Sequence, residues 1–204
     1  MKKLLVSTVV VAAIYCTFVL PGVAQKAPYP TQSSANPTGP DATFLKKAME
    51  ANAAEVQLGQ LAQSKSQNQQ VKDFGAMMVK DHTKAFDRLQ DAAKSSGAAG
   101  TQPGGTASPD QFPLSKQDQD LKNRLEKLSG PEFDRVYMKA MVDDHRKDIQ
   151  EFEREAGQQT SGRQKPQGEA GGSPQIKAVA QELLPTLKKH LQEAESIQKQ
   201  LGSK

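Results

Sequence analysis

Apolar residues recur every three or four positions over four long stretches of the chain, which is the spacing of an amphipathic α-helix. This pattern predicts long helices over about 41–64, 69–97, 131–157 and 174–201. A shorter stretch, over about 115–128, has the same spacing and predicts an additional short helix before the third long one. No stretch alternates apolar and polar residues in the manner of a strand. The chain is therefore expected to be all-α.

The connections between these helices predict how they pack. The first two helices are separated by only a few residues, so they should be antiparallel neighbours. Stretches rich in Gly, Pro, Ser and Thr over 98–113 and 158–172 are predicted to be low-complexity linkers. Ser66 and Ser129 each begin a capping-box pattern. We interpret 41–201 as a four-helix bundle.

The N-terminus has the pattern of a secretory signal peptide. Two lysines precede an apolar run over 4–20, and small residues lead to Ala24, after which we expect cleavage. An uncleaved membrane anchor is the alternative, since the run reaches the lower end of a spanning length. With 1–24 removed, no membrane span would remain, and 25–40 would be a flexible tether. The expected location is the periplasm or cell envelope.

The composition excludes several classes of function. Removing the two N-terminal lysines lowers the formal charge from +4 to +2, and acidic and basic residues are interleaved along the later helices. Such a pattern is typical of solvated helix faces, so no nucleic-acid partner is expected. Cleavage would also remove Cys16, the only cysteine. No Ser-His-Asp arrangement, nucleophilic cysteine, phosphate loop or nucleotide motif is found, and no catalytic residue is predicted.

The candidate chemistry lies in a phrase that occurs twice. Met78–Lys84 reads Met-Val-Lys-Asp-His-Thr-Lys, and Met141–Lys147 reads Met-Val-Asp-Asp-His-Arg-Lys. Each copy places one histidine, His82 or His145, on the apolar stripe of its predicted helix. The third and last histidine of the chain, His190, lies on the stripe of the final helix.

Glu55 occupies the corresponding stripe of the first helix. Glu55, His82, His145 and His190 each lie roughly 20–25 Å from the start of their helices, at 1.5 Å per residue. They are therefore expected to meet in one layer inside the bundle. Burying these polar groups is costly unless they pair or bind something. The layer predicts a site for a transition metal ion (Zn, Fe, Mn or Cu), and a hydrogen-bonded structural layer is the alternative.

Other residues near this layer have less definite roles. Soft methionine sulfurs could suit copper or haem iron, but methionines at helical spacing usually fill a core. Asp81 and Asp144, which precede the histidines, either orient a histidine of a neighbouring helix or are surface charges. The methionines are Met49, Met78 and Met141.

Several phrases of this chain are similar to those of one protein family. They are Phe44–Ala48, Ala54–Gly59, Phe74–His82, Leu128–Asp134 with Tyr137, Asp144-His145 and Leu187–Ala194. With these phrases the chain resembles, over about 41–201, secreted ferritin-like domains of unknown function from Gram-negative bacteria. Members are often labelled as outer-membrane proteins. The resemblance implies a ferritin-like up-down four-helix bundle, located in the periplasm or envelope.

The chain departs from true ferritins at their metal site. Di-iron bundles carry Glu-x-x-His on two helices, whereas Val79, Val142 and Leu187 stand three residues before the histidines here. We therefore expect a metal-binding or metal-responsive bundle, tied to envelope stress and without assigned catalysis. The alternatives are a structural or protein-interaction bundle and a metal-dependent oxidoreductase.

Overall fold

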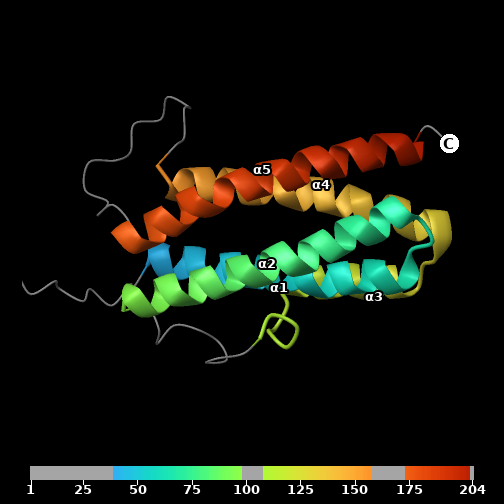
Figure 1. The fold of residues 1–204 in the computed structure, drawn as a ribbon. Helices are drawn as coiled ribbons and strands as arrows, with labels where there is room; N and C mark the ends of the chain where they lie inside the picture. The colour runs from blue at the N-terminus through green and yellow to red at the C-terminus, as the bar shows by residue number, and fades with distance from the viewer. Residues whose placement is uncertain (1–38, 98–107, 158–172, 203–204) are drawn as a thin grey trace, which may run out of the picture. The chain divides into compact units, whose positions relative to one another are not determined.

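The structure is a computed structural model that describes residues 39–97, 108–157 and 173–202. These residues form five α-helices and no strand, which confirms the all-α prediction (Figure 1). The helices are α1 (Pro40–Lys65), α2 (Gln69–Ser95), α3 (Lys116–Glu126), α4 (Gly130–Glu155) and α5 (Pro174–Gly202). The predicted short helix before the third long one is therefore present as α3.

Several expectations concern residues outside the described ranges. The chain divides into two units, Met1–Ser33 and Ser34–Lys204, and all five helices belong to the second. The predicted signal peptide (1–24), most of the tether (25–40) and the linker over 158–172 lie outside the described residues. Within the described part of the chain, no helix has both the length and the apolar character needed to cross a membrane.

Two predicted capping boxes are wrong. The side chain of Asn68, and not that of Ser66, caps α2 by accepting a hydrogen bond from the backbone N–H of Gln70. The Ser66 hydroxyl instead donates to the buried carboxylate of Asp134 on α4. Ser129 precedes α4 without a side-chain cap. A contact between distant helices thus determines the orientation of Ser66, which local sequence could not indicate.

The four long helices pack side by side, each against two neighbours. α1 lies along α2 and α4 lies along α5, and the two pairs meet through α2 with α5 and α1 with α4. α3 lies against α1 and α4, on the opposite side of the assembly from the seam between α2 and α5. The two contacts between the helix pairs therefore differ. The α1–α4 contact is covered by α3, and the α2–α5 contact is open to the surface.

The direction of the helices follows from Figure 1. α2 and α4 run the same way, and α1 and α5 run the opposite way, so every neighbouring pair is antiparallel. The chain must return along the assembly between α2 and α4, and α3 lies in that connection. The order is therefore up, down, down, up, with one long crossover between two helical hairpins.

A close approach between two backbones fixes the α1–α2 pair. A Cβ added to Gly59 would lie 2.7 Å from the carbonyl oxygen of Gly75, and one added to Gly75 would lie 2.8 Å from that of Gly59. Real Cβ atoms do not approach backbone oxygens so closely. Only glycine at both positions allows the two helices to pack at this distance.

Residues just before α3 also belong to the core. Phe112 lies within the predicted linker over 98–113, but its ring is buried and packs edge-on against Phe86 at a centroid distance of 5.1 Å. The Gln57 side chain donates to the carbonyl oxygens of Pro109 and Phe112. This segment and α3 cover the outer side of α1, which explains why Ala53 through Val56 are all buried.

Candidate metal site

A polar layer divides the apolar core into two clusters. One cluster includes Phe44, Phe86 and Phe152, and the other includes Leu58, Phe74 and Met141. The residues between them are the four predicted from the sequence: Glu55, His82, His145 and His190, which are at most 3% exposed. All four side chains therefore point inward at a similar height, as the helical spacing predicted.

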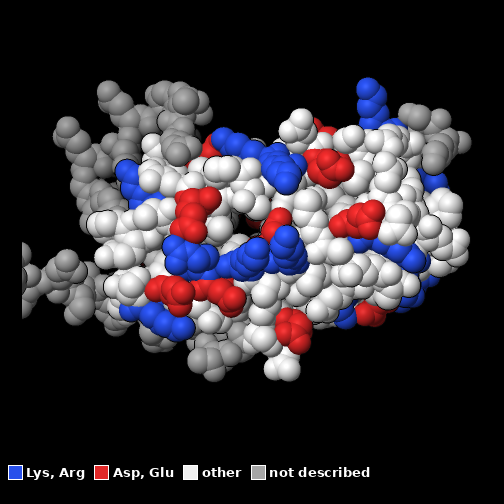
Figure 2. Space-filling view, viewed as in Figure 1, with Lys and Arg blue, Asp and Glu red and all other residues white. Residues whose placement is uncertain are grey.

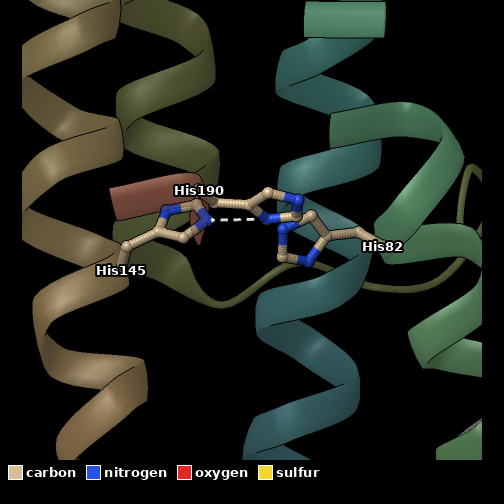
Figure 3. A group of neighbouring side chains, drawn as sticks. All are labelled: His82, His145 and His190. Carbon is tan, nitrogen blue, oxygen red and sulfur yellow. Dashed lines mark hydrogen bonds between the residues drawn. The ribbon is translucent and has the colours of Figure 1, made fainter. Parts of the chain in front are cut away.

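The three histidines come from three helices and converge on one point (Figure 3). One ring nitrogen from each of His82, His145 and His190 lies within 4.8 Å of the others. The ring centroids are 5.1–5.4 Å apart. Among the described residues, no other group of three histidine or acidic side chains brings its ligand atoms so close together.

Two of the imidazoles, those of His145 and His190, direct a nitrogen lone pair toward each other. His145 donates its Nδ1–H to the carbonyl oxygen of Met141 at 2.9 Å, because that oxygen can only accept. His190 donates its Nε2–H to the carboxylate of Asp81 at 3.2 Å. Each neutral ring has a single N–H, so Nε2 of His145 and Nδ1 of His190 carry lone pairs. These two atoms lie 3.4 Å apart, the contact drawn as a dashed line in Figure 3, and with these tautomers no proton lies between them.

The third imidazole is held in the same way. The Asn52 amide donates to the carbonyl of Ala48 at 2.6 Å, which fixes its oxygen as the acceptor for His82. His82 therefore donates its Nδ1–H to Asn52 Oδ1 at 2.9 Å. Its Nε2 is buried without a hydrogen-bond partner and points toward the other two rings. Three lone pairs thus converge, and each ring is anchored through its other nitrogen.

The surroundings keep these rings neutral. Burial, followed by the neighbouring His145 and His190, holds the pKa of His82 well below its usual range. Burial and then His190 lower the pKa of His145 to about 4. Burial also lowers the pKa of His190, against the opposing effect of its hydrogen bond to Asp81. At neutral pH the layer therefore presents three uncharged imidazoles, the form in which histidine binds metals.

Glu55 belongs to the layer but lies on a different side of His145. Its Oε1 is 3.5 Å from His145 Nδ1, the nitrogen turned away from the convergence point. Its Oε2 is buried and has no hydrogen-bond partner. The hydroxyl of Tyr137 is likewise buried without a partner. Burial, followed by Asp144 and Asp148, raises the pKa of Glu55 well above its usual range. The structure thus brings the three histidines together and places Glu55 behind one of them.

The two aspartates of the repeated phrase have different partners. Asp81 contacts His190 on the neighbouring helix, whereas Asp144 pairs with Lys147 at 3.1 Å. One copy therefore orients a histidine and the other forms a local ion pair. Met78 and Met141 are fully buried in the core cluster beside the layer, together with apolar side chains.

The donor set fits a transition metal ion. Two nitrogens bound to one tetrahedral zinc ion are about 3.3 Å apart for Zn–N distances near 2.0–2.1 Å. The 3.4 Å between His145 Nε2 and His190 Nδ1 matches this spacing. Hydrogen bonds from the outer nitrogens of imidazole ligands to carboxylates or carbonyls are the usual support for such sites. His145 and His190 have such partners, and an amide oxygen serves His82.

Figure 2 shows the face of the molecule formed by α2 and α5. Acidic and basic side chains are interspersed on it, and a narrow hollow lies between the two helices. The Asp81–His190 hydrogen bond joins these same helices, and the Asp81 side chain is 27% exposed. At the seam between α2 and α5 the histidine layer is thus linked to a partly exposed side chain.

Comparison with known proteins places the chain in a family. A family model described as a domain of unknown function, DUF4142, matches residues 26–197. The chain belongs to this family. No curated protein and no solved structure matches the chain. The finer resemblance to secreted, ferritin-like domains stays a prediction.

Proposed function

We propose that this protein is a ferritin-like helical bundle of the periplasm or cell envelope that binds one transition metal ion through His82, His145 and His190. The observation that carries the proposal is the orientation of the three rings. Each ring donates its outer N–H to a protein acceptor and directs its remaining lone pair inward. A layer built only for stability would place a proton between two such nitrogens, whereas a cation is attracted by all three.

The ligand set favours certain metals. Neutral imidazoles suit Zn²⁺, Cu²⁺ and Fe²⁺, whereas Mn²⁺ prefers oxygen ligands. Three protein nitrogens leave a fourth position for water or another ligand in a tetrahedral site. The carboxylates of Glu55 and Asp81 lie behind His145 and His190 and would offset the charge of the ion. In this proposal Glu55 acts from behind His145 and is not itself a ligand.

The topology and the N-terminus support the remaining parts of the proposal. Two antiparallel hairpins joined by one long crossover are the arrangement of ferritin-like bundles. The basic start, apolar run and small residues up to Ala24 support export and a location in the envelope.

Metal analysis of the purified protein tests this function. We expect about one Zn²⁺ or Cu²⁺ ion per chain and a melting temperature that rises when either metal is added. Replacing any one of the three histidines by glutamine should weaken binding at least about tenfold, since each supplies a ligand. Asp144→Asn is the matched control, because Asp144 pairs with Lys147 and not with a histidine. Absence of bound metal, together with no thermal shift for Zn²⁺, Cu²⁺, Fe²⁺ or Mn²⁺, would leave the histidines as a structural layer.

A further inference from the structure

Glu55 also lines a cavity that none of the three histidines lines. It has a volume of about 330 Å³ and is formed by side chains of α1, α3 and α4 and the residues just before α3. Six of its thirteen lining residues are acidic and two are lysines. The acidic residues are Glu50, Glu55, Asp118, Asp144, Asp148 and Glu151. This cavity is distinct from the point on which the imidazole lone pairs converge.

Basic side chains pair with only half of these carboxylates. Glu50 pairs with Lys46, Glu151 with Lys47 and Arg154, and Asp144 with Lys147. In the described part of the chain, no lysine or arginine lies within ion-pairing distance of the remaining three. These three are Glu55 from α1, Asp118 from α3 and Asp148 from α4. Three carboxyl groups without an ion-pair partner therefore lie where three helices meet, and Lys147 acts on Asp118 and Asp148 only from a longer distance.

Glu55 points to a ligand independently of this excess of acid. It is 3% exposed and lines the cavity, yet its Oε2 has no hydrogen-bond partner. A buried carboxylate oxygen without a partner is costly, because it gives up water and gains nothing in return. Burial, followed by neighbouring carboxylates, raises the pKa of Asp148 to about 7. A cation in the cavity would offset the repulsion between these carboxylates and would give a buried carboxylate a partner.

We propose that this cavity binds a hydrated divalent cation of the hard class, such as Mg²⁺ or Ca²⁺, through Glu55, Asp118 and Asp148. Hard cations prefer carboxylate oxygens and water, which are the ligands available here. No three acidic side chains among the described residues bring their oxygens within 4.8 Å of one another. The ion therefore keeps part of its water shell, and the cavity has room for roughly ten water molecules at about 30 Å³ each.

The two sites meet at Glu55 and differ in chemistry. Oε1 of Glu55 lies 3.5 Å from Nδ1 of His145, and the same side chain lines the acidic cavity, with its Oε2 buried and without a hydrogen-bond partner. The nitrogen ligands favour transition metals, whereas the oxygen ligands favour Mg²⁺ or Ca²⁺. Occupation of the cavity does not require the histidines, so the proposal stands or falls separately from the transition-metal site.

Thermal unfolding of the purified protein in MgCl₂ or CaCl₂ tests the proposal. Sodium chloride at equal ionic strength is the reference, because salt alone screens repulsion between carboxylates. We expect the melting temperature to rise by roughly 5 °C more with at least one divalent cation than with sodium chloride. Equal shifts in all three salts would overturn the proposal.

Two near-isosteric variants locate the ion. Asp118→Asn and Asp148→Asn should each raise the melting temperature without divalent cations, because repulsion falls, and reduce the divalent-specific shift by at least half. Asp120→Asn is the matched control on α3: Asp120 is exposed, pairs with Lys116 and does not line the cavity. Circular dichroism checks that each variant is folded. A divalent-specific shift that persists unchanged in both cavity variants would contradict the assignment.

A histidine variant separates this site from the first one. His82→Gln removes a predicted ligand of the transition metal but does not line the acidic cavity. The divalent-specific shift should therefore be retained in His82→Gln. Its loss would place Mg²⁺ or Ca²⁺ at the histidines and overturn the second site, while leaving the first proposal to its own test.

Discussion

The Nε2 atom of His145 and the Nδ1 atom of His190 lie 3.4 Å apart with a lone pair on each. Both rings have committed their N–H to other acceptors, the Met141 carbonyl and the Asp81 carboxylate. Two lone pairs at this distance repel each other unless a positive charge lies near both. The partnerless Nε2 of His82 adds a third lone pair to the same region. This arrangement, and not the mere presence of histidine, is the basis for a metal site.

The acidity of the imidazoles predicts an unusual pH dependence of metal binding. A free imidazole has a pKa near 6.5, and protons then compete with metal below that pH. Burial lowers the pKa of all three rings here, and that of His145 to about 4. We expect the affinity for Zn²⁺ to change little between about pH 7 and 6, where free imidazoles already take up protons, and to fall at lower pH, toward pH 4 through His145. Titration calorimetry in this range would measure it, and a steep loss already between pH 7 and 6 would contradict the prediction.

The repeated phrase offers a matched pair of variants. Asp81→Asn keeps a hydrogen-bond acceptor beside His190 but removes its charge, so we expect metal affinity to fall by roughly tenfold. Asp144→Asn at the equivalent position of the other copy removes a surface ion pair with Lys147 and should leave the affinity unchanged. Competition with a chromogenic chelator measures both. Equal effects of the two substitutions would mean that Asp81 does not act through His190.

Asp148 predicts that the free energy of unfolding also depends on pH. Its contribution to stability decreases as the pH rises, whereas the affinity of the histidines for Zn²⁺ increases. Its pKa is raised to about 7 in the folded protein, so its protonated form adds stability below about pH 4, and this is lost as the pH rises toward 7. In the Asp148→Asn variant the side chain at this position is an amide and is uncharged at every pH. Its free energy of unfolding should equal that of the wild type near pH 4 and exceed it by roughly 1–3 kcal/mol at about pH 8.

Urea denaturation in the presence of a chelator would measure this difference. The chelator removes divalent cations that would otherwise neutralise the cavity. The exposed Asp120→Asn on α3 serves as the control and should show no comparable growth with pH. A difference between Asp148→Asn and the wild type that stays constant from about pH 4 to 8 would argue against a charged, destabilising Asp148.

The close approach of α1 and α2 predicts a large effect from a single methyl group. Gly59→Ala and Gly75→Ala each place a Cβ against a backbone oxygen, so the helices must move apart. We expect each to lower the free energy of unfolding by roughly 1–3 kcal/mol, although alanine favours helix more than glycine does. Gly202→Ala, where a Cβ would meet nothing within 4 Å, is the control. Urea denaturation of the three variants would reveal the difference, and equal stability of all three would show that the contact can adjust.

The sequence predicted the helices and the inward orientation of the histidines because both follow from periodicity along a single helix. The relative height of His82, His145 and His190 also follows from distance along each helix. What periodicity does not encode is rotation about a helix axis relative to a neighbour. For this reason the sequence placed Glu55 in the layer but could not show that it lies behind His145.

Residues whose roles depend on a distant partner were also beyond sequence reasoning. Asn52 holds His82 and lies on the same helix face as Ala48 and Glu55, but its position there does not show which residue it holds. Phe112 lies among turn-forming residues, and only the packing against Phe86 shows that it belongs to the core. The mutual approach of Gly59 and Gly75 becomes visible only when two helices are brought together.

The parallel course of α2 and α4 gives the layer an approximate two-fold symmetry. An axis along the assembly exchanges α2 with α4 and α1 with α5, since each of these pairs lies diagonally and runs in one direction. His82 then corresponds to His145, which explains the repeated phrase, and His190 corresponds to Glu55. The symmetry is broken chemically at this last pair. A bound ion would therefore be displaced from the axis toward α5, and a histidine at position 55 would create a second set of nitrogen ligands, related to the first by the two-fold axis.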